Sequence, residues 1–275
     1  MGKLVTRPIV TLTTDFGLRD PSVGSMKGII VSMAPDVTLV DLTHDIPRHA
    51  VAAASYVLTR TAHYFPPGSI HLAVVDPGVG SSRRPLVGSA GGHRYVGPDN
   101  GLFAEILNRD PSSEWFEITN PRYWLKPPLH SPTFQGRDVF APAAAWLAGG
   151  VALQTFGPRL MQLATLGPET SHSEQPGAVG SRQGSIIWVD RFGNLISGIE
   201  AGNDVRGLAV SISGREFRFV GHYAEAPTGE PAAIVNSDAL VEVFINRGDA
   251  AAMLGAGVGT PIALVRAGGG APHDG

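Results

Sequence analysis

The sequence contains no cysteine, little charge and no long apolar run. Without cysteine there is no disulfide, no thiol nucleophile and no metal site built on thiolates. The net charge is −3 and no run of Lys and Arg exceeds two residues, so a basic face for nucleic acid is not expected.

Membrane and export signals are also lacking. Asp15 arrives too early for the apolar core of a signal peptide, and the most apolar segment, residues 250–265, is short and rich in glycine. We therefore predict a cytoplasmic protein without membrane contact. The 275 residues, 43% of them hydrophobic, are enough for one large globular domain or two smaller ones.

In the first half, apolar strand-like runs alternate with helical stretches of about twelve residues. Strands are expected at 8–14, 37–42, 70–75, 86–89 and 94–96, and helices at 21–33, 50–62, 102–107 and 138–147. This alternation is typical of βαβ units, so we predict an α/β, Rossmann-like domain with a mostly parallel sheet.

The second half has short β-like runs and no long helical periodicity, which indicates a small all-β, barrel-like domain. The runs lie at 185–189, 195–199, 208–212, 216–220, 232–235, 240–245 and 261–265. Between the halves, Gly, Pro, Ser, Glu and His occur without periodicity. The predicted organisation is an α/β domain at 1–167, a linker at 168–184, a β domain at 185–267 and a disordered tail at 268–275.

Polar residues follow three of the predicted strands: Asp15, then Thr43-His44-Asp45, then Asp76. In open α/β sheets, ligands sit beyond the carboxyl ends of the strands. Asp15 and Asp76 are therefore candidate site residues, although each could instead cap the turn that follows it. Arg83 comes seven residues after Asp76, across a Pro-Gly turn, and could form either a charge-assisted pair in a site or an ordinary surface salt bridge.

Other motifs are incomplete. Asp15-Phe16-Gly17 lacks the glycine-rich loop of a kinase, and Gly78-Val79-Gly80 lacks the third glycine of a dinucleotide-binding turn. His44 and Asp45 could be combined with Asp15 and Asp76 in a metal site, but the histidines show no metal-ligand spacing. No metal is predicted.

Seven ordered motifs carry a resemblance to a known family. They are Thr14-Asp15-Phe16-Gly17 with Asp20, Ser22 and Val23; Pro35-Asp36-Val37; Thr43-His44-Asp45-Ile46; Val75-Asp76-Pro77-Gly78-Val79-Gly80 with Arg83; Gly97-Pro98-Asp99-Asn100-Gly101; Thr133-Phe134-Gln135-Gly136-Arg137-Asp138 with Phe140-Ala141-Pro142; and Asp190-Arg191-Phe192-Gly193-Asn194-Leu195. Together they resemble the adenosine-forming S-adenosyl-L-methionine (SAM) hydrolases, also called SAM hydroxide adenosyltransferases, which are relatives of fluorinase and chlorinase. The resemblance extends to about residue 265 and is weaker after residue 200.

The resemblance implies an N-terminal α/β domain, a C-terminal β domain and a homotrimer, with each site between the N-domain of one subunit and the C-domain of the next. Water or hydroxide would displace methionine from the ribose C5′ carbon and leave adenosine. No metal or organic cofactor is implied.

The resemblance also assigns roles to residues of the first half. Asp76 and Arg83 would hold the attacking water. The two oxygens of Asp15 would accept the ribose hydroxyls. Asp20 and Ser22 would meet the methionine end of the substrate.

Six residues of the second half would complete the substrate site: Phe192, Tyr223, Asn194, Asn246, Arg247 and Ala256. The two aromatic residues would pack on adenine, and Asn194 would bind its edge. Asn246 and Arg247 would hold the methionine carboxylate. Ala256 would contribute a backbone contact to adenine.

Gln135 departs from the family pattern, which has His at this place. An amide can donate and accept hydrogen bonds but cannot carry a proton away. The sulfonium is a strong leaving group that needs no acid, so we expect positioning of the water to dominate, with Gln135 in the catalytic set. His130 is an alternative proton acceptor.

Two other functions stay open at this stage. The halogenases have Tyr where this chain has Asp76, Ser where it has Gly136, and a long insertion where it has only residues 88–94. A buried carboxylate at position 76 would repel a halide, which favours water as the nucleophile. A non-catalytic adenosyl-ligand binder is the second alternative, and Gln135 is its only support.

Overall fold

The computed structural model describes residues 7–126, 131–166, 175–176, 182–202 and 204–267. Internal contacts divide the chain into two compact units, residues 1–166 and 167–275, and each is described by itself. The predicted linker falls largely, and the predicted tail entirely, outside the described residues.

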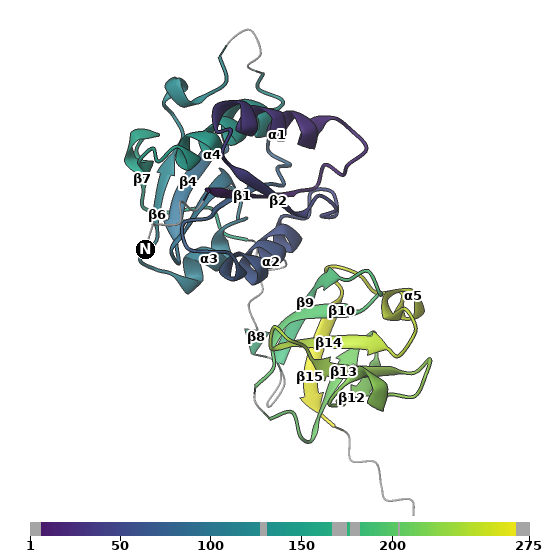
Figure 1. Ribbon diagram of the computed structural model, residues 1–275. Coiled ribbons are helices and arrows are strands. Elements are labelled where there is room, and N and C mark those ends of the chain that lie inside the picture. Colours follow the sequence, from purple (N-terminus) through teal and green to yellow (C-terminus); the bar gives the residue numbers. More distant parts are fainter. Residues whose placement is uncertain (1–6, 127–130, 167–174, 177–181, 203, 268–275) are drawn as a thin grey trace, which may run out of the picture. The chain divides into compact units, whose positions relative to one another are not determined.

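The first unit is built on a seven-stranded mixed sheet in the order β2-β1-β3-β5-β4-β6-β7 (Figure 1). The first four strands in that order are parallel neighbours, and the remaining pairings are antiparallel. The strands are β1 (Ile9–Thr14), β2 (Thr38–Thr43), β3 (Ile70–Val74), β4 (Pro85–Ala90), β5 (His93–Pro98), β6 (Glu114–Glu117) and β7 (Arg159–Leu160). The predicted α/β class is confirmed, with the parallel strands in one half of a mixed sheet.

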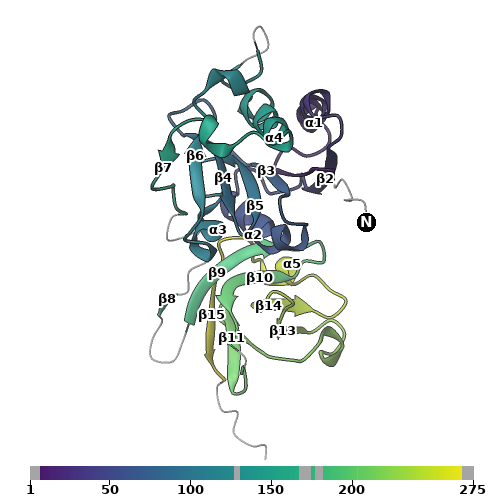
Figure 2. The same cartoon turned by 60° about the vertical axis from the view of Figure 1, so that its left-hand side comes forward.

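Helices cover both faces of this sheet, as the two views show (Figures 1 and 2). They are α1 (Ser22–Met33), α2 (Val51–Thr61), α3 (Ala104–Arg109) and α4 (Ala141–Ala148). Residues of β1 alternate between the faces, so Val10 and Leu12 pack in one core with Met26 and Ile30 of α1. Helix α4 lies on the same face as α1, while α2 and α3 lie on the other.

A π-helical turn, Gly136–Phe140, leads directly into α4. The sequence pattern predicts an ordinary helix over 138–147, and the structure instead places a wider turn at its start. Gln135, one of the predicted site residues, immediately precedes this turn.

The second unit is an antiparallel sheet in the order β12-β11-β15-β9-β10-β14-β13, with β8 beside β9. An isolated bridge between Phe219 and Ala233 joins its two ends, so the sheet is nearly closed. The strands are β8 (Gln175–Pro176), β9 (Arg182–Val189), β10 (Leu195–Glu200), β11 (Leu208–Ile212), β12 (Arg215–Arg218), β13 (Pro231–Val235), β14 (Leu240–Ile245) and β15 (Pro261–Arg266), with helix α5 (Ala250–Leu254) after β14. The predicted barrel-like β domain is confirmed.

Short 3₁₀ turns complete the described elements: η1 (Ala62–Tyr64), η2 (Pro121–Tyr123), η4 (Leu153–Thr155) and η5 (Tyr223–Glu225). None of the helices in the described part of the chain combines the length and apolar composition needed to cross a membrane.

Candidate functional site

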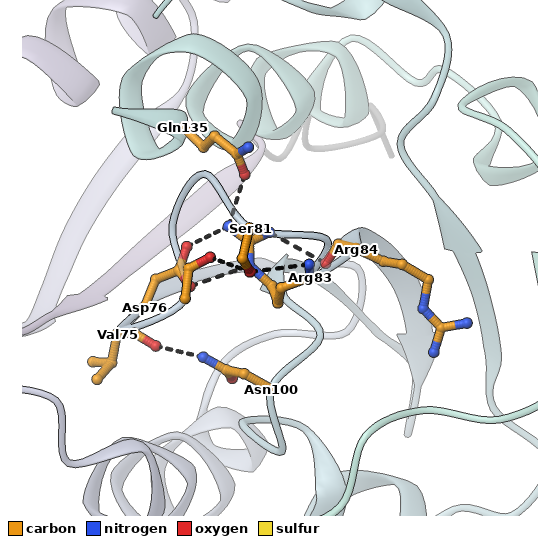
Figure 3. A network of polar contacts seen from close by, with 8 residues as sticks. Val75, Asp76, Ser81, Arg83, Arg84, Asn100 and Gln135 are labelled. Atoms are coloured by element: carbon orange, nitrogen blue, oxygen red, sulfur yellow. Dashed lines mark hydrogen bonds and ion pairs between the residues drawn. The ribbon is translucent and has the colours of Figure 1, made fainter. Parts of the chain in front are cut away.

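Asp76, Arg83 and Gln135 form one polar cluster beyond the end of β3 (Figure 3). Arg83 binds the Asp76 carboxylate through two nitrogens: Nε donates to Oδ1 at 3.1 Å, and Nη2 donates to Oδ2. The same Nη2 donates to Gln135 Oε1 at 2.7 Å. The pair is a buried bidentate ion pair, because the side chains of Arg83 and Asp76 are only 6% and 4% exposed. The three residues predicted to be catalytic therefore lie together.

The orientation of Gln135 follows from this contact. Its amide oxygen accepts from Arg83, which leaves the amide nitrogen as the group that can donate to a ligand. Gln135 thus supplies a hydrogen-bond donor next to the Asp76 carboxylate and no proton acceptor.

Burial of the Asp76 carboxylate raises its pKa above the ordinary value, and the nearby negative charge of Asp15 acts in the same direction. The charge and hydrogen bonds of Arg83 oppose this effect without cancelling it. Asp76 therefore gains a proton more readily than an exposed aspartate as the pH falls.

The loop that carries Asp76 and Arg83 is fixed by its own polar contacts. Ser81 Oγ donates to Gly78 O at 2.7 Å and accepts from Arg83 N at 3.2 Å. Asn100 Nδ2 donates to Val75 O at 2.8 Å, directly before Asp76. These bonds explain part of the Gly97–Gly101 motif, which lies too far along the chain for sequence reasoning to connect it with Asp76.

The same motif also holds the last described residues of the first unit. Asp99 pairs with Arg84, and its Oδ1 accepts from Ala164 N at 2.7 Å. Gly101 has a positive φ of 97°, and a Cβ added there would lie 2.9 Å from Leu166 Cδ2. Glycine is therefore required where residue 166 crosses this turn.

A second group of predicted residues lines a cavity of about 460 Å³ at the ends of β1 and β2. Asp15 and Asp20 both line it, together with Arg19, His44 and Arg48. Asp15 Oδ2 accepts from the backbone N–H of His49 at 3.0 Å, which leaves Oδ1 without a hydrogen bond in the described structure. Ser22 is the first residue of α1 and does not line this cavity.

His44 supports the turn that presents Asp15. Its Nδ1 lies 2.8 Å from Thr14 Oγ1, and its Nε2 lies 3.1 Å from Asp41 Oδ1. Thr14 Oγ1 also accepts from Phe16 N at 3.2 Å, so this line of contacts braces both sides of Asp15. The Thr43-His44-Asp45 motif follows a predicted strand, and the structure gives its histidine this supporting role.

Asp138, in the same motif as Gln135, is fully buried and holds the segment before Gln135. Its Oδ2 accepts from Ser131 N at 2.6 Å, and Arg137 pairs with its carboxylate at 2.6 Å. His130, the alternative proton acceptor, lies outside the described residues.

The second unit has its own cavity, of about 580 Å³, at one end of the barrel strands β9, β10 and β14. Five of the six residues predicted there line it: Phe192, Asn194, Tyr223, Asn246 and Arg247. Three separate segments contribute them: the β9–β10 turn, the segment after β12 and the residues that follow β14.

Ala256 is the predicted residue that the structure does not bring to this cavity. It is buried in the barrel core, and its backbone N–H donates to Ala251 O at 3.1 Å. A contact from this N–H to a ligand would first require that bond to break.

Asp190 was not among the predicted site residues, and it organises the β9–β10 turn. Its Oδ1 accepts from the backbone N–H groups of Phe192 and Asn194 at 2.8 and 2.9 Å. Its Oδ2 accepts from Asn194 Nδ2 at 3.0 Å, and the Asn194 amide oxygen takes no part in this contact. Asp190 is the first residue of the Asp-Arg-Phe-Gly-Asn motif, and its place in that motif was the signal that could have identified it.

Gly193 allows this turn to approach the start of α5. It has a φ of 80°, and a Cβ there would lie 2.1 Å from Asp249 Oδ1. Asp249 caps α5 by accepting from Ala252 N at 2.8 Å, and Ala251 N donates to Gly193 O at 2.9 Å. Asp249 and Phe244 also line the cavity, and neither lies in a motif that sequence reasoning singled out.

Within the described ranges, no three His, Asp or Glu side chains are grouped so that they could hold a metal ion. The absence of a cofactor stays a prediction.

Comparison with protein families gives two adjacent matches. Residues 10–157 match the SAM hydroxide adenosyltransferase N-terminal domain, and residues 184–263 match the C-terminal domain of the same name. The two matches fall one in each compact unit.

Curated relatives agree with these matches. A protein named (R)-S-adenosyl-L-methionine hydrolase from Thermus thermophilus is 39% identical over 94% of this chain and 100% of its own length. One of the same name from Salinispora arenicola is 36% identical over 91% of this chain and 95% of its own. A fluorinase from Actinopolyspora mzabensis is more distant, at 26% identity.

Among solved structures, an uncharacterized conserved protein from Thermotoga maritima has a TM-score of 0.84 and 31% identity. The match covers 94% of this chain and the whole length of that protein. The likeness therefore includes both units.

Proposed function

Because the chain belongs to the SAM hydroxide adenosyltransferase family, we propose that it hydrolyses S-adenosyl-L-methionine to adenosine and L-methionine. The observation that carries the proposal is the buried Asp76–Arg83 pair with Gln135 beside it, in a chain 39% identical to a protein named for this activity. The oxygen of water attacks the ribose C5′ carbon in line with the departing sulfur. A C–O bond forms, the C–S bond breaks with its electron pair left on methionine, and water releases one proton.

Asp76 holds the attacking water by accepting a hydrogen bond from it, and Gln135 Nε2 offers a donor beside it. Arg83 keeps the carboxylate in place and its charge balanced. The pKa of water is about 15.7 and that of an ordinary aspartate about 3.9, a gap that corresponds to roughly 16 kcal/mol. Full deprotonation before attack is therefore too costly, and the proton leaves late, after C–O bond formation has begun.

Substrate binding is assigned to the two cavities and to Ser22 and Ala256, which do not line them. Asp15 accepts the ribose hydroxyls through its carboxylate, and Asp20 and Ser22 meet the methionine end. In the second unit, Phe192 and Tyr223 pack on adenine and Asn194 binds its edge. Asn246 and Arg247 hold the methionine carboxylate, and Ala256 contributes a backbone contact to adenine.

The site is shared between subunits in this proposal. The exposed aromatic Phe192 (74% exposed) and the half-exposed Tyr223 in the second unit are suited to be covered by a ligand and by a neighbouring copy. The proposal also includes a cytoplasmic homotrimer that uses no metal or organic cofactor.

The test is incubation of the purified protein with SAM, followed by chromatographic measurement of adenosine and methionine. We expect equal amounts of both products, and unchanged SAM would contradict the hydrolase. A parallel incubation with chloride or fluoride tests the halogenase, which would give a 5′-halogenated nucleoside. Unchanged SAM with a calorimetric binding signal would instead identify an adenosyl-ligand binder.

A further inference from the structure

Strand β14 is buried along its whole length, and a single acidic residue interrupts its apolar sequence. Successive strand residues point to opposite faces, and Val241 and Val243 pack in the barrel core. Glu242 and Phe244 therefore point to the other face. Phe244 lines the 580 Å³ cavity there, and Glu242 is only 4% exposed.

The Glu242 carboxylate is the anchor of a half-exposed tyrosine. Tyr223 Oη donates to Glu242 Oε1 at 2.8 Å, and Asn236 Nδ2 donates to Oε2 at 3.2 Å. The Tyr223 ring also meets Phe244 edge to face, with centroids 4.7 Å apart and an interplanar angle of 88°. Tyr223 is thus held at its hydroxyl and at its ring.

This carboxylate is costly to bury. No Lys, Arg or His among the described residues forms an ion pair with Glu242, and burial raises its pKa. Burial and the bond to Glu242 also raise the pKa of Tyr223, so its hydroxyl stays protonated and continues to donate. A leucine in this position would avoid the desolvation cost, so the fold alone does not account for the acid.

We propose that Glu242 is a positioning residue that holds Tyr223 as a fixed aromatic wall of the adenosyl-binding cavity. Tyr223 lies in the short turn η5 and is 46% exposed, so without an acceptor its ring can rotate away from Phe244. Because the Tyr223 ring is already fixed, binding of the ligand does not cost its conformational entropy. The ligand class rests on the proposed function, whereas the positioning of Tyr223 does not.

The affinity test compares Glu242→Leu, Tyr223→Phe and the double variant by calorimetry with adenosine. We expect each single change to weaken adenosine binding about five- to tenfold, and the double variant to be no weaker, because both remove the same bond. Glu242→Gln keeps an acceptor and should recover most of the affinity. Losses that add in the double variant, or unchanged binding in Glu242→Leu, would overturn the proposal.

The matched control is Ser197→Ala. Ser197 is fully buried in the same barrel, its Oγ donates to Val241 O at 2.8 Å, and it does not line the cavity. We expect this change to lower the melting temperature without altering adenosine affinity. A general loss of barrel stability would instead weaken binding in both variants.

A ligand-free measurement separates this inference from the proposed function. In the NMR spectrum of the unliganded protein, ring–ring contacts between Tyr223 and Phe244 should persist in the wild type and in Ser197→Ala. They should disappear in Glu242→Leu. Contacts that remain in Glu242→Leu would refute the positioning role, whereas failure of the wild type to bind adenosine would refute only the adenosyl function.

Discussion

At the scale of single residues, the proposed function assigns the nucleophile to Asp76, and the structure sets it apart from the acids assigned to the substrate. The Asp76 carboxylate is buried and paired with Arg83. Asp76 does not line the cavity that Asp15 and Asp20 line. Asp15 is close enough to influence the pKa of Asp76, so the two functions are neighbours. Substitutions at the two acids should therefore affect different kinetic constants.

Asp76→Asn removes the proton acceptor and keeps the size of the side chain. We expect kcat for SAM hydrolysis to fall by about 10²- to 10⁴-fold, with adenosine affinity changed by less than about threefold. Steady-state kinetics and calorimetry check this, with the exposed Asp36→Asn as the control. Equal losses in kcat and affinity would place Asp76 in substrate binding instead.

Because the Gln135 amide cannot take up a proton, Asp76 is the proton acceptor of this cluster. Activity should fall as the pH drops, because protonated Asp76 no longer accepts from water, and this decline should begin above the ordinary pKa of 3.8 because burial raises the pKa. Gln135→His should add a second inflection near the ordinary histidine pKa of about 6.5. A pH–rate profile of both proteins is the measurement, and identical profiles would argue against contact between residue 135 and the reacting water.

The sequence could identify residues whose position follows from a strand end or a motif. Asp15 and Asp76 are predictable because parallel strands bring their carboxyl ends to one edge. Glu242 and Asn100 are not, because their partners lie elsewhere in the chain and no local pattern specifies the contact.

At the scale of elements, β1 and β3 are joined by a buried polar contact as well as by their backbone. Thr11 Oγ1 lies 2.8 Å from His71 Nδ1, and both residues are fully buried. Burial lowers the pKa of His71 to about 3, and the charge of His93 acts in the same direction. The folded protein therefore keeps this imidazole neutral at every pH near neutrality.

This histidine should make the first unit less stable in acid. Between pH 6.5 and about 3 the unfolded chain binds a proton at His71 that the folded chain rejects, so stability falls as the pH falls. The contribution is about 1.4 kcal/mol per pH unit within that window. Urea unfolding at pH 7, 6 and 5 should show a shallower decline for His71→Gln, and an unchanged slope would contradict the assignment.

Strands with a clear apolar run were predictable, whereas β6 and β7 were not. Strands β6 and β7 have only four and two residues, too few to show alternation. Asp138, within the π-helical turn before α4, binds Ser131, and sequence periodicity encodes neither this contact nor the turn.

At the scale of the whole molecule, the predicted site residues are divided between two units with separate hydrophobic cores. Asp76 and its partners lie in one, and the aromatic residues proposed to hold adenine lie in the other. Sequence composition indicated this division, because helical periodicity ends near the boundary. It could not indicate the oligomer, which depends on surfaces that no residue pattern identifies.

The proposed trimer predicts a mass in solution of three times the 28.8 kDa chain. Light scattering coupled to size exclusion measures it directly. Because each site would need two subunits, dilution below the assembly constant should lower the specific activity. A monomer with full activity would contradict the shared site.

The Gly97–Gly101 turn has a mechanical consequence. Asn100 binds the carbonyl just before Asp76, Asp99 binds the chain at residue 164, and Gly101 leaves room for residue 166, where the first unit ends. The backbone just before Asp76 and the chain at residue 164 are therefore held by one turn, so loosening this turn should disturb both.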